Sequence, residues 1–363
     1  MKKMISIIIS VIILLLFTLM ILFKKDYFSE NENRYLEEFP KFSINNLFSG
    51  KYTTKIDSYI TDHFPFRNYF LGLKTFSLKI IKTPKISDVY IGTDDYLLEE
   101  FNKPKNNESI ARIINKFIDN NNDKNIEIMF VPTSTYIYSD KLPKTTLNYN
   151  QHKVIEYYKK NINTSFIDVT DTLLANKDSY IYYRTDHHWT MKGSYLAYKE
   201  YCEYNHITPL NYQVKTVNND FYGTYYSKIL DNTLDKDIIY KINIPTNLKI
   251  TYDNKKNNKI FFDNWLNKKD KYSYYLDGNH KIITIYNSNS SSQEKLLIIK
   301  DSYANNFIPF LINHYNEITI IDPRYYKDSI NKYINSNDYN NILFLYNIST
   351  LDDDLGIRTI NRK

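Results

Sequence analysis

The chain has almost no cysteine and no concentrated block of charge. Its single cysteine, Cys202, excludes an intramolecular disulfide and is expected to be buried beside Tyr201. The formal net charge of +6 is spread thinly, with no cluster of lysine or arginine beyond the ends of the first apolar run. Such a distribution argues against nucleic acid as a partner. No internal repeat is visible, so a repeat array is not expected.

Arginine is also scarce, since only seven of the 47 basic residues are arginines. Where lysine is the usual cation, an arginine is expected at positions that need its planar, bidentate guanidinium group. Four of them lie in the most distinctive stretches of the sequence: Arg34, Arg67, Arg184 and Arg324. The alternative is that these four are ordinary surface charges.

One long hydrophobic run is present, at the N-terminus. Residues 1–23 read MKKMISIIISVIILLLFTLMILF, in which about twenty uncharged residues follow two lysines, enough to cross a bilayer core of roughly 30 Å. The run ends in two lysines and an aspartate without an Ala-x-Ala-like step, which favours an uncleaved signal anchor over residues 1–25. Because no second such run follows, we predict a single-pass membrane protein whose remaining chain is extracytoplasmic.

Residues 26–87 predict a juxtamembrane helical region. Apolar residues between 44 and 60 have helical spacing, Pro65 favours the end of that helix, and Asn68 is placed to begin the next one. Within the stretch DHFPFR, Asp62 and Arg67 are expected to form a local ion pair.

The remaining residues, 88–363, predict one α/β domain. A hairpin is expected over residues 88–100, where two β-rich runs flank GTDD. Beyond it, helices alternate with apolar runs that lack polar alternation, which indicates a parallel sheet covered on both faces in a three-layer α/β/α arrangement. Residues 207–292 break the pattern and predict a β-rich insertion. Helices are expected at 109–120, 151–160, 190–204 and from 302 to about 314, and strands at 125–132, 165–169, 181–186, 294–302, 316–322 and 341–347.

Three polar stretches follow predicted strands of this sheet. They are RTDHHWT, with Asp186, His187 and His188, then KDSYANNF, with Ser302, and IDPRYY, with Arg324. In open parallel sheets, functional groups gather at the carboxyl ends of the strands. A serine nucleophile needs a histidine to take its proton and a carboxylate to orient that histidine, and these stretches supply all three groups. The alternatives are that Asp-Ser is only a helix cap and that one histidine is buried while the other is exposed.

A metal site built on the Asp-His-His stretch is a second interpretation. Adjacent side chains on a strand point to opposite faces, so His187 and His188 are not expected to bind the same ion. No further histidine, aspartate or glutamate cluster has a convincing metal-ligand spacing. We therefore predict neither a metal nor a cofactor.

The stretch TDHHWT is the signature of the DHHW proteins. The chain resembles that family and its relatives, the alginate O-acetyltransferase group, which have an SGNH-hydrolase-like fold. The supporting stretches are ENRYLEEFP, DHFPFR, VYIG, FVP, FYGTYYSK and KDSYANNFIPFL, which occur in the family's order. The resemblance covers most of the predicted extracytoplasmic part.

This resemblance implies an Asp-x-His-Trp arrangement in which Asp186 orients the base His188 and Ser302 is the nucleophile. His187 would then point to the opposite side. It also implies a permuted motif order, because the histidine block precedes the serine. Where many SGNH hydrolases have Gly-Asp-Ser, this chain has Lys300-Asp301-Ser302, so a backbone donor associated with that glycine is in doubt.

Further residues are candidates for an oxyanion or substrate-binding role on the same resemblance. The Ser302 amide and Asn306 are possible oxyanion donors. Trp189 is expected in the core beneath the histidines, with sugar stacking as its alternative role. The candidates are Asn305, Arg324, Tyr325, Trp189 and Arg184.

The resemblance implies an O-acetyltransferase that acts on a cell-surface or exported polysaccharide. Ser302 would form an acyl-enzyme, and a polysaccharide hydroxyl would replace water as the acceptor. The acetyl donor would come from a polytopic membrane O-acyltransferase as partner. Two alternatives stay open: an acetyl esterase that uses the same residues, and a non-catalytic glycan-binding or assembly protein, for which the 16% aromatic content would suit sugar stacking.

Overall fold

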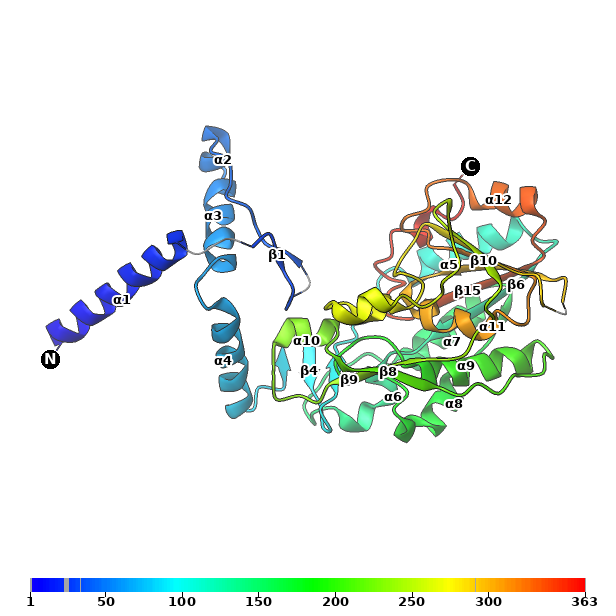
Figure 1. The fold of residues 1–363 in the computed structure, drawn as a ribbon, viewed down its shortest axis with the longest axis horizontal. Coiled ribbons are helices and arrows are strands. Elements are labelled where there is room, and N and C mark those ends of the chain that lie inside the picture. Colours follow the sequence, from blue (N-terminus) through cyan, green and yellow to red (C-terminus); the bar gives the residue numbers. More distant parts are fainter. Residues whose placement is uncertain (1, 23–25, 33, 291, 363) are drawn as a thin grey trace. The chain divides into compact units, whose positions relative to one another are not determined.

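The computed structural model describes residues 2–22, 26–32, 34–290 and 292–362 (Figure 1). Its contacts divide the chain into two compact units. The first comprises Met1–Ser87 together with Tyr226–Leu234, and the second comprises Asp88–Tyr225 together with Asp235–Lys363. The site predicted above lies wholly in the second unit.

The N-terminal unit is mainly helical, as the sequence predicts. Gly50, with a φ of 75°, separates α2 from α3, so the helix expected between residues 44 and 60 is two helices. A left-handed Phe66 precedes α4. The elements are α1 Lys2–Leu22, β1 Phe28–Ser29, β2 Arg34–Tyr35, α2 Ile44–Phe48, α3 Lys51–Asp62, α4 Arg67–Ile80 and β3 Lys85–Ile86.

The N-terminal apolar run forms the helix α1. In the part of the chain that the structure describes, no helix has the combined length and hydropathy that crossing a membrane requires. The predicted transmembrane helix is therefore not supported by the structure, and the end of the predicted anchor at residues 23–25 lies outside the described residues.

Arginine ion pairs join the segments of the N-terminal unit. Arg34 pairs with both carboxylate oxygens of Asp62, one of them at 2.9 Å, and Arg67 pairs with Glu32. The Arg34 guanidinium holds the pKa of the Asp62 carboxyl below its usual value. Arg67 approaches Asp62 only to 3.8 Å, so the predicted Asp62–Arg67 pair is secondary to the one with Arg34.

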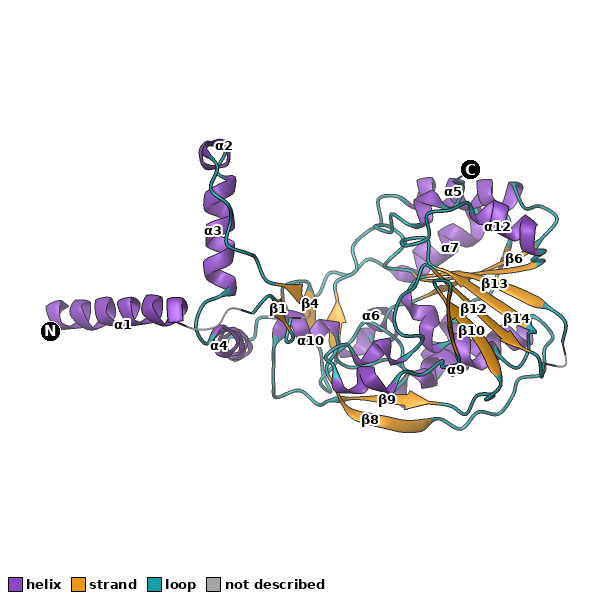
Figure 2. Cartoon of the chain, turned by 45° about the horizontal axis from the view of Figure 1, so that its top comes forward, coloured by secondary structure: helices purple, strands orange, loops and turns teal. Residues whose placement is uncertain are grey.

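The second unit is built on an eight-stranded sheet with the order β11-β10-β12-β14-β13-β15-β6-β7 (Figure 2). The five strands from β14 to β7 are parallel, and β12, β10 and β11 extend the sheet with antiparallel pairings. The sheet is therefore mixed but mostly parallel. Its strands are β6 Asn125–Val131, β7 Ser165–Phe166, β10 Leu248–Tyr252, β11 Lys255–Asn257, β12 Ile282–Asn287, β13 Lys295–Lys300, β14 Glu317–Ile321 and β15 Asn341–Asn347.

Two apolar clusters cover opposite faces of this sheet. Alternate residues of β13 divide between them, because Ile298 belongs to one cluster and Leu297 and Ile299 to the other. On one side lie α9 Met191–Tyr204 and α11 Ile308–Leu311, and on the other α5 Asn107–Asp119, α7 Gln151–Asn161 and α12 Ile330–Asn337.

The short elements outside the sheet are β4 Val89–Ile91, β5 Leu97–Glu99, α6 Ser134–Ile137, α8 Thr170–Ala175, β8 Lys215–Phe221, α10 Thr224–Ile229 and β9 Asp237–Lys241, with 3₁₀ turns at Ser139–Lys141, Lys177–Ser179, Asp263–Asn267, Lys271–Tyr274, Ser302–Asn306 and Ile357–Thr359.

Some of the strands and helices predicted for the second unit are confirmed, and others are corrected. The hairpin at residues 88–100 is confirmed, since β4 and β5 pair antiparallel. Residues 181–186 form no strand, only an isolated bridge between Tyr182 and Trp189. Residues 207–292 contribute the separate pair β8–β9, but they also supply three strands of the main sheet. After Ser302 the chain forms a 3₁₀ turn and then the four-residue α11, not one helix to residue 314.

Candidate active site

Ser302 lies one residue beyond the end of the buried strand β13, at the first position of a 3₁₀ turn. The preceding residue, Asp301, fixes this turn. One of its carboxylate oxygens accepts from the backbone N–H of Tyr303 at 2.9 Å, while the other accepts from Asn347 N at 2.8 Å and Thr350 Oγ1 at 2.6 Å. Asp301 thus joins the carboxyl ends of the neighbouring strands β13 and β15. The partly exposed Ser302 lies at this end of the sheet.

The loop that carries the two histidines is held by a second buried carboxylate. Asp237, at the start of β9, accepts hydrogen bonds from Tyr180 Oη at 2.6 Å and Arg184 N at 2.8 Å. It also accepts from Thr185 N at 2.8 Å and Thr185 Oγ1 at 2.6 Å. Because this carboxylate satisfies the polar groups just before Asp186, it sets the position from which Asp186 and His188 project.

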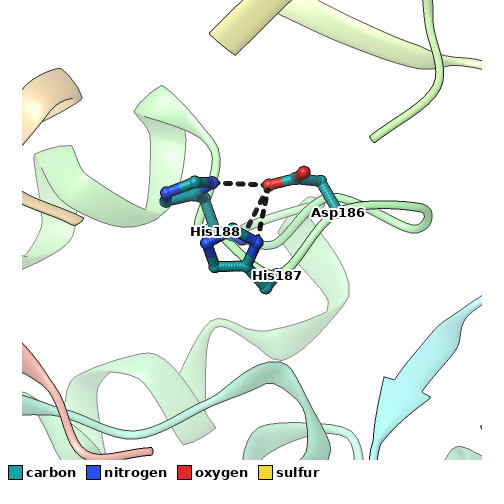
Figure 3. A group of neighbouring side chains, drawn as sticks. All are labelled: Asp186, His187 and His188. Atoms are coloured by element: carbon teal, nitrogen blue, oxygen red, sulfur yellow. Dashed lines mark hydrogen bonds and ion pairs between the residues drawn. The ribbon is translucent and has the colours of Figure 1, made fainter. Parts of the chain in front are cut away.

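Asp186, His188 and Ser302 form one continuous chain of hydrogen bonds. The Nε2 atom of His188 lies 2.8 Å from Ser302 Oγ, and its Nδ1 lies 2.5 Å from Asp186 Oδ1. The same Oδ1 accepts from the backbone N–H of His188 at 3.0 Å. Figure 3 shows the carboxylate and both imidazoles. The structure thus brings together the three residues that the sequence predicts as nucleophile, base and orienting carboxylate.

The second carboxylate oxygen of Asp186 is also occupied. It accepts from Thr224 N at 2.9 Å and from Thr224 Oγ1 at 3.2 Å. The neighbouring Gly223 has no room for a side chain, because a Cβ there would overlap the Cβ and carboxylate of Asp186. In the sequence the stretch FYGTYYSK carries only a family resemblance, and nothing in it indicates this contact with Asp186.

Burial and charge set the protonation states of the triad. Burial would raise the pKa of Asp186, but the adjacent imidazoles and the hydrogen bonds outweigh it and hold that pKa well below its usual range. Burial lowers the pKa of His188 against the opposing effect of Asp186. At neutral pH the arrangement is therefore a carboxylate beside a neutral imidazole that can accept the proton of Ser302.

Tyr272 packs against the base. Its ring stacks on His188 with centroids 3.6 Å apart and an interplanar angle of 10°, and its hydroxyl donates to the carbonyl oxygen of Ser302 at 3.0 Å. One side chain therefore touches both the base and the nucleophile's backbone. No sequence signal distinguished it among 36 tyrosines.

The prediction that His187 points away from His188 is wrong. The two rings lie 3.7 Å apart at an angle of 37°, and His187 Nδ1 lies 2.7 Å from Thr224 Oγ1. Residues 186–188 form a bend instead of a strand, so the alternation of side chains between two faces does not apply. The side chain of His187 is 30% exposed.

The same bend brings together a possible metal-binding group. Among the described residues, Asp186, His187 and His188 offer ligand atoms that all lie within 4.8 Å of one another. The expectation that His187 and His188 cannot bind the same ion assumed that their side chains point to opposite faces of a strand, and this assumption does not hold. Both Nδ1 atoms already have partners, however, and an ion held there would displace the Asp186–His188 hydrogen bond.

The other candidate residues have partners of their own. Asn305 is buried, its Oδ1 accepts from Lys300 Nζ at 2.8 Å, and its Nδ2 donates to Gly278 O at 3.3 Å. Arg324 forms a bidentate pair with Asp322, at 2.8 and 2.6 Å, and its guanidinium lies 5.6 Å from the ring of Tyr325. Tyr325 is 49% exposed.

Trp189 and Arg184 each pack against aromatic residues. Trp189 is fully buried, and its indole N–H donates to Tyr303 O at 2.9 Å, which is the core position that the sequence predicts as one of its two roles. The guanidinium of Arg184 lies 5.0 Å from the ring of Tyr180 and 5.6 Å from that of Tyr96.

Comparison with known proteins agrees with this architecture. The family described as DHHW protein matches residues 79–321. A crystal structure of a DHHW family protein from Eubacterium siraeum is 27% identical, with a TM-score of 0.67 over 76% of this chain and 95% of that one. PatB1 of Bacillus cereus with a sulfonyl adduct is 20% identical, with a TM-score of 0.64 over 76% and 98% of the two chains.

A more distant similarity is to the O-acetyltransferase domain of AlgJ from Pseudomonas putida. It is 14% identical, with a TM-score of 0.48 over 75% of this chain and 98% of that one. No curated protein matches the chain significantly.

Proposed function

The chain belongs to the DHHW protein family, and from that premise we propose that it is a serine-dependent O-acetyltransferase of an extracytoplasmic polysaccharide. The observation that carries the proposal is the unbroken hydrogen-bond chain from Ser302 Oγ through His188 to Asp186. A hydroxyl connected in this way to a neutral imidazole and a buried carboxylate is equipped for covalent acyl transfer.

In the first half-reaction the serine takes up the acyl group. His188 Nε2 accepts the proton of Ser302 as the serine oxygen attacks the carbonyl carbon of the acetyl donor. Asp186 stabilises the imidazolium that forms, and its hydrogen bonds to Thr224 keep the carboxylate in place. The tetrahedral intermediate collapses as His188 returns the proton to the leaving group. The product is acetyl-Ser302.

In the second half-reaction a hydroxyl group of the polysaccharide takes the acetyl group. His188 accepts the proton of that hydroxyl while its oxygen attacks the ester carbonyl of acetyl-Ser302, and the same proton then returns to the serine oxygen as the C–O bond breaks. Water in place of the sugar hydroxyl would make the same site an acetyl esterase. The esterase is therefore the second candidate, because it needs no residue beyond the triad.

Membrane tethering and a donor-supplying partner complete the proposal. The uncharged N-terminal run supports a tether over residues 1–25, and α4 exposes apolar side chains that suit a surface in contact with other molecules: Tyr69, Phe70, Leu73 and Phe76 are 44–70% exposed. A polytopic membrane O-acyltransferase would supply acetyl groups to such a tethered enzyme. Recovery of the full chain in the soluble fraction of lysed cells would contradict the tether.

Product analysis tests the function itself. The full chain is incubated with an activated acetyl ester and a soluble polysaccharide, and acetylated polysaccharide and free acetate are measured separately. We expect acetylated polysaccharide from the wild type and from the surface control His152→Ala, and none from Ser302→Ala or His188→Ala. Acetate alone from the wild type would favour the esterase. Equal trivial rates in all four folded proteins would favour a glycan-binding protein without catalysis.

A further inference from the structure

His187 adjoins the base but has no part in the triad. Its ring lies 3.7 Å from that of His188, and its Nδ1 contacts the hydroxyl of Thr224 at 2.7 Å. Tyr303 Oη donates to the backbone carbonyl oxygen of His187, so the backbone that carries this ring is also fixed. An imidazole fixed this firmly, and still 30% exposed, is placed to meet a bound molecule.

The hydrogen bonds around Thr224 determine the tautomer of His187. The Asp186 carboxylate can only accept, so the Thr224 hydroxyl donates its single proton to Asp186 Oδ2 at 3.2 Å. Thr224 Oγ1 must therefore accept in its contact with His187, which places the proton of that ring on Nδ1. Burial, followed by the neighbouring His188, lowers the pKa of His187 to about 4, so at neutral pH the ring carries no second proton. Its Nε2 is then a hydrogen-bond acceptor.

This acceptor points in the same direction as the nitrogen that activates the serine. Figure 3 shows both rings with one nitrogen turned toward Asp186 and the other on the opposite side of the ring. For His188 that opposite nitrogen is Nε2, which contacts Ser302 Oγ at 2.8 Å. In the described part of the chain, no protein group donates a hydrogen bond to Nε2 of His187. Two acceptor nitrogens therefore lie side by side, one for the reacting hydroxyl and one without a partner.

We propose that His187 Nε2 accepts a hydrogen bond from a second hydroxyl of the acceptor sugar, on the carbon next to the one that is acetylated. The inference rests on the proposed transferase function and assigns its acceptor class: a vicinal diol. The attacking hydroxyl gives its proton to His188, while the neighbouring hydroxyl keeps its own proton and only donates a hydrogen bond to His187. Because one molecule supplies both oxygens, a diol is oriented by both imidazoles, whereas a water molecule supplies only one oxygen.

The test measures, for each variant, the ratio of product formed with two different acceptors. A substitution that slows the enzyme with both acceptors equally leaves this ratio unchanged. The full chain is acylated with p-nitrophenyl acetate in the presence of either methyl glucoside, which has vicinal hydroxyls, or ethanol, which has one. Acetylated product is measured relative to free acetate. We expect the wild type to favour methyl glucoside over ethanol by roughly tenfold, the contribution of one hydrogen bond. His187→Leu should reduce this preference to near one.

His187→Gln separates a hydrogen-bonding role from a purely structural one. A glutamine amide can donate to Thr224 and offer its carbonyl oxygen to the sugar, so part of the preference should return. An unchanged preference in His187→Leu would overturn the inference while leaving the transferase intact.

A third measurement keeps the inference testable if the enzyme proves to be an esterase. If the wild type releases only acetate with every acceptor, the transferase proposal fails first. Hydrolysis of monoacetylated ethylene glycol against ethyl acetate then probes the same contact, because the neighbouring hydroxyl would still meet His187. We expect His187→Leu to raise the KM for the glycol ester more than the KM for ethyl acetate. If the ratio of the two KM values is the same in His187→Leu as in the wild type, the inference is overturned on its own.

Discussion

Replacing Asp186 by asparagine should abolish most of the activity without unfolding the protein. The carboxylate accepts from His188 Nδ1 and His188 N through Oδ1, and from Thr224 N and Oγ1 through Oδ2. Asparagine has only one oxygen. If that oxygen turns to the backbone N–H of Thr224, the amide NH₂ faces His188 and favours the tautomer with its proton on Nε2, which cannot accept the proton of Ser302.

The size of the loss follows from the two interactions removed. Stabilising the correct neutral tautomer by a hydrogen bond to a charged group contributes about 1.5–3 kcal/mol, and stabilising the imidazolium in the transition state a comparable amount. Together these give about 3–6 kcal/mol, or roughly a 10²- to 10⁴-fold fall in kcat. The matched control is Asp123→Asn, whose carboxyl is 70% exposed and pairs only with the adjacent Lys124 among the described residues.

The pH profile of the same variant distinguishes this mechanism from a general loss of structure. The wild type should lose activity as the pH falls through the pKa of His188, which burial places below 6.5, because the base must be neutral. Asp186 opposes that lowering, so removing its charge should move the acidic limb to still lower pH while the plateau drops. A plateau within about tenfold of the wild type, in a folded variant, would refute the reasoning, since it would leave less than about 1.4 kcal/mol to the carboxylate.

Three further predictions concern residues that support the site or the N-terminal unit. Tyr272→Phe keeps the ring on His188 but removes the hydroxyl that donates to Ser302 O, so we expect a fall in kcat of up to roughly tenfold, against a larger fall in Tyr272→Ala. Gly223→Ala should lower both activity and Tm because its Cβ overlaps Asp186, whereas Gly72→Ala, whose Cβ would meet its nearest atom at 3.6 Å, should leave both nearly unchanged. Asp62→Asn should destabilise the N-terminal unit by about 1–3 kcal/mol at pH 7. Because the pKa of Asp62 is depressed in the folded protein, this difference should persist at about pH 4 and disappear only as the pH falls through that depressed pKa, which thermal unfolding at pH 7 and well below pH 4 checks. An equal destabilisation at both pH values would contradict the role of charge at Asp62.

The parallel part of the sheet, Asp186 and Ser302 could be found in the sequence because their signals are local, whereas the choice of His188 over His187 as the base follows from the resemblance to the DHHW family. A buried apolar strand such as β13, followed at once by Asp301 and Ser302, is readable without knowledge of the fold. The parallel order of β13, β14 and β15 follows from the helices that separate them. The antiparallel pairing of β12 with β14 could not be foreseen, because residues 207–292 carry no periodic pattern strong enough to place them in the main sheet.

The residues around the triad were missed because they meet it only in three dimensions. Thr224, Asp237 and Tyr272 lie between 36 and 84 positions from His188 in the sequence and are of common residue types. His187 was misplaced for a local reason: the expected strand alternation fails where residues 186–188 bend. A bend that turns neighbouring side chains to one side has no signature in a single sequence comparable to the period of a strand.

The measurement that tests the central claim most directly is the mass of the covalent intermediate. The full chain is mixed with p-nitrophenyl acetate, quenched in acid, digested and mapped by mass spectrometry, alongside Ser302→Ala, His188→Ala and the exposed-serine control Ser165→Ala. We predict a single acetyl group on Ser302 in the wild type and the control. It should be absent from Ser302→Ala and strongly reduced in His188→Ala. An acetyl group on another residue that still turns over in Ser302→Ala would contradict the assignment of Ser302 as the nucleophile.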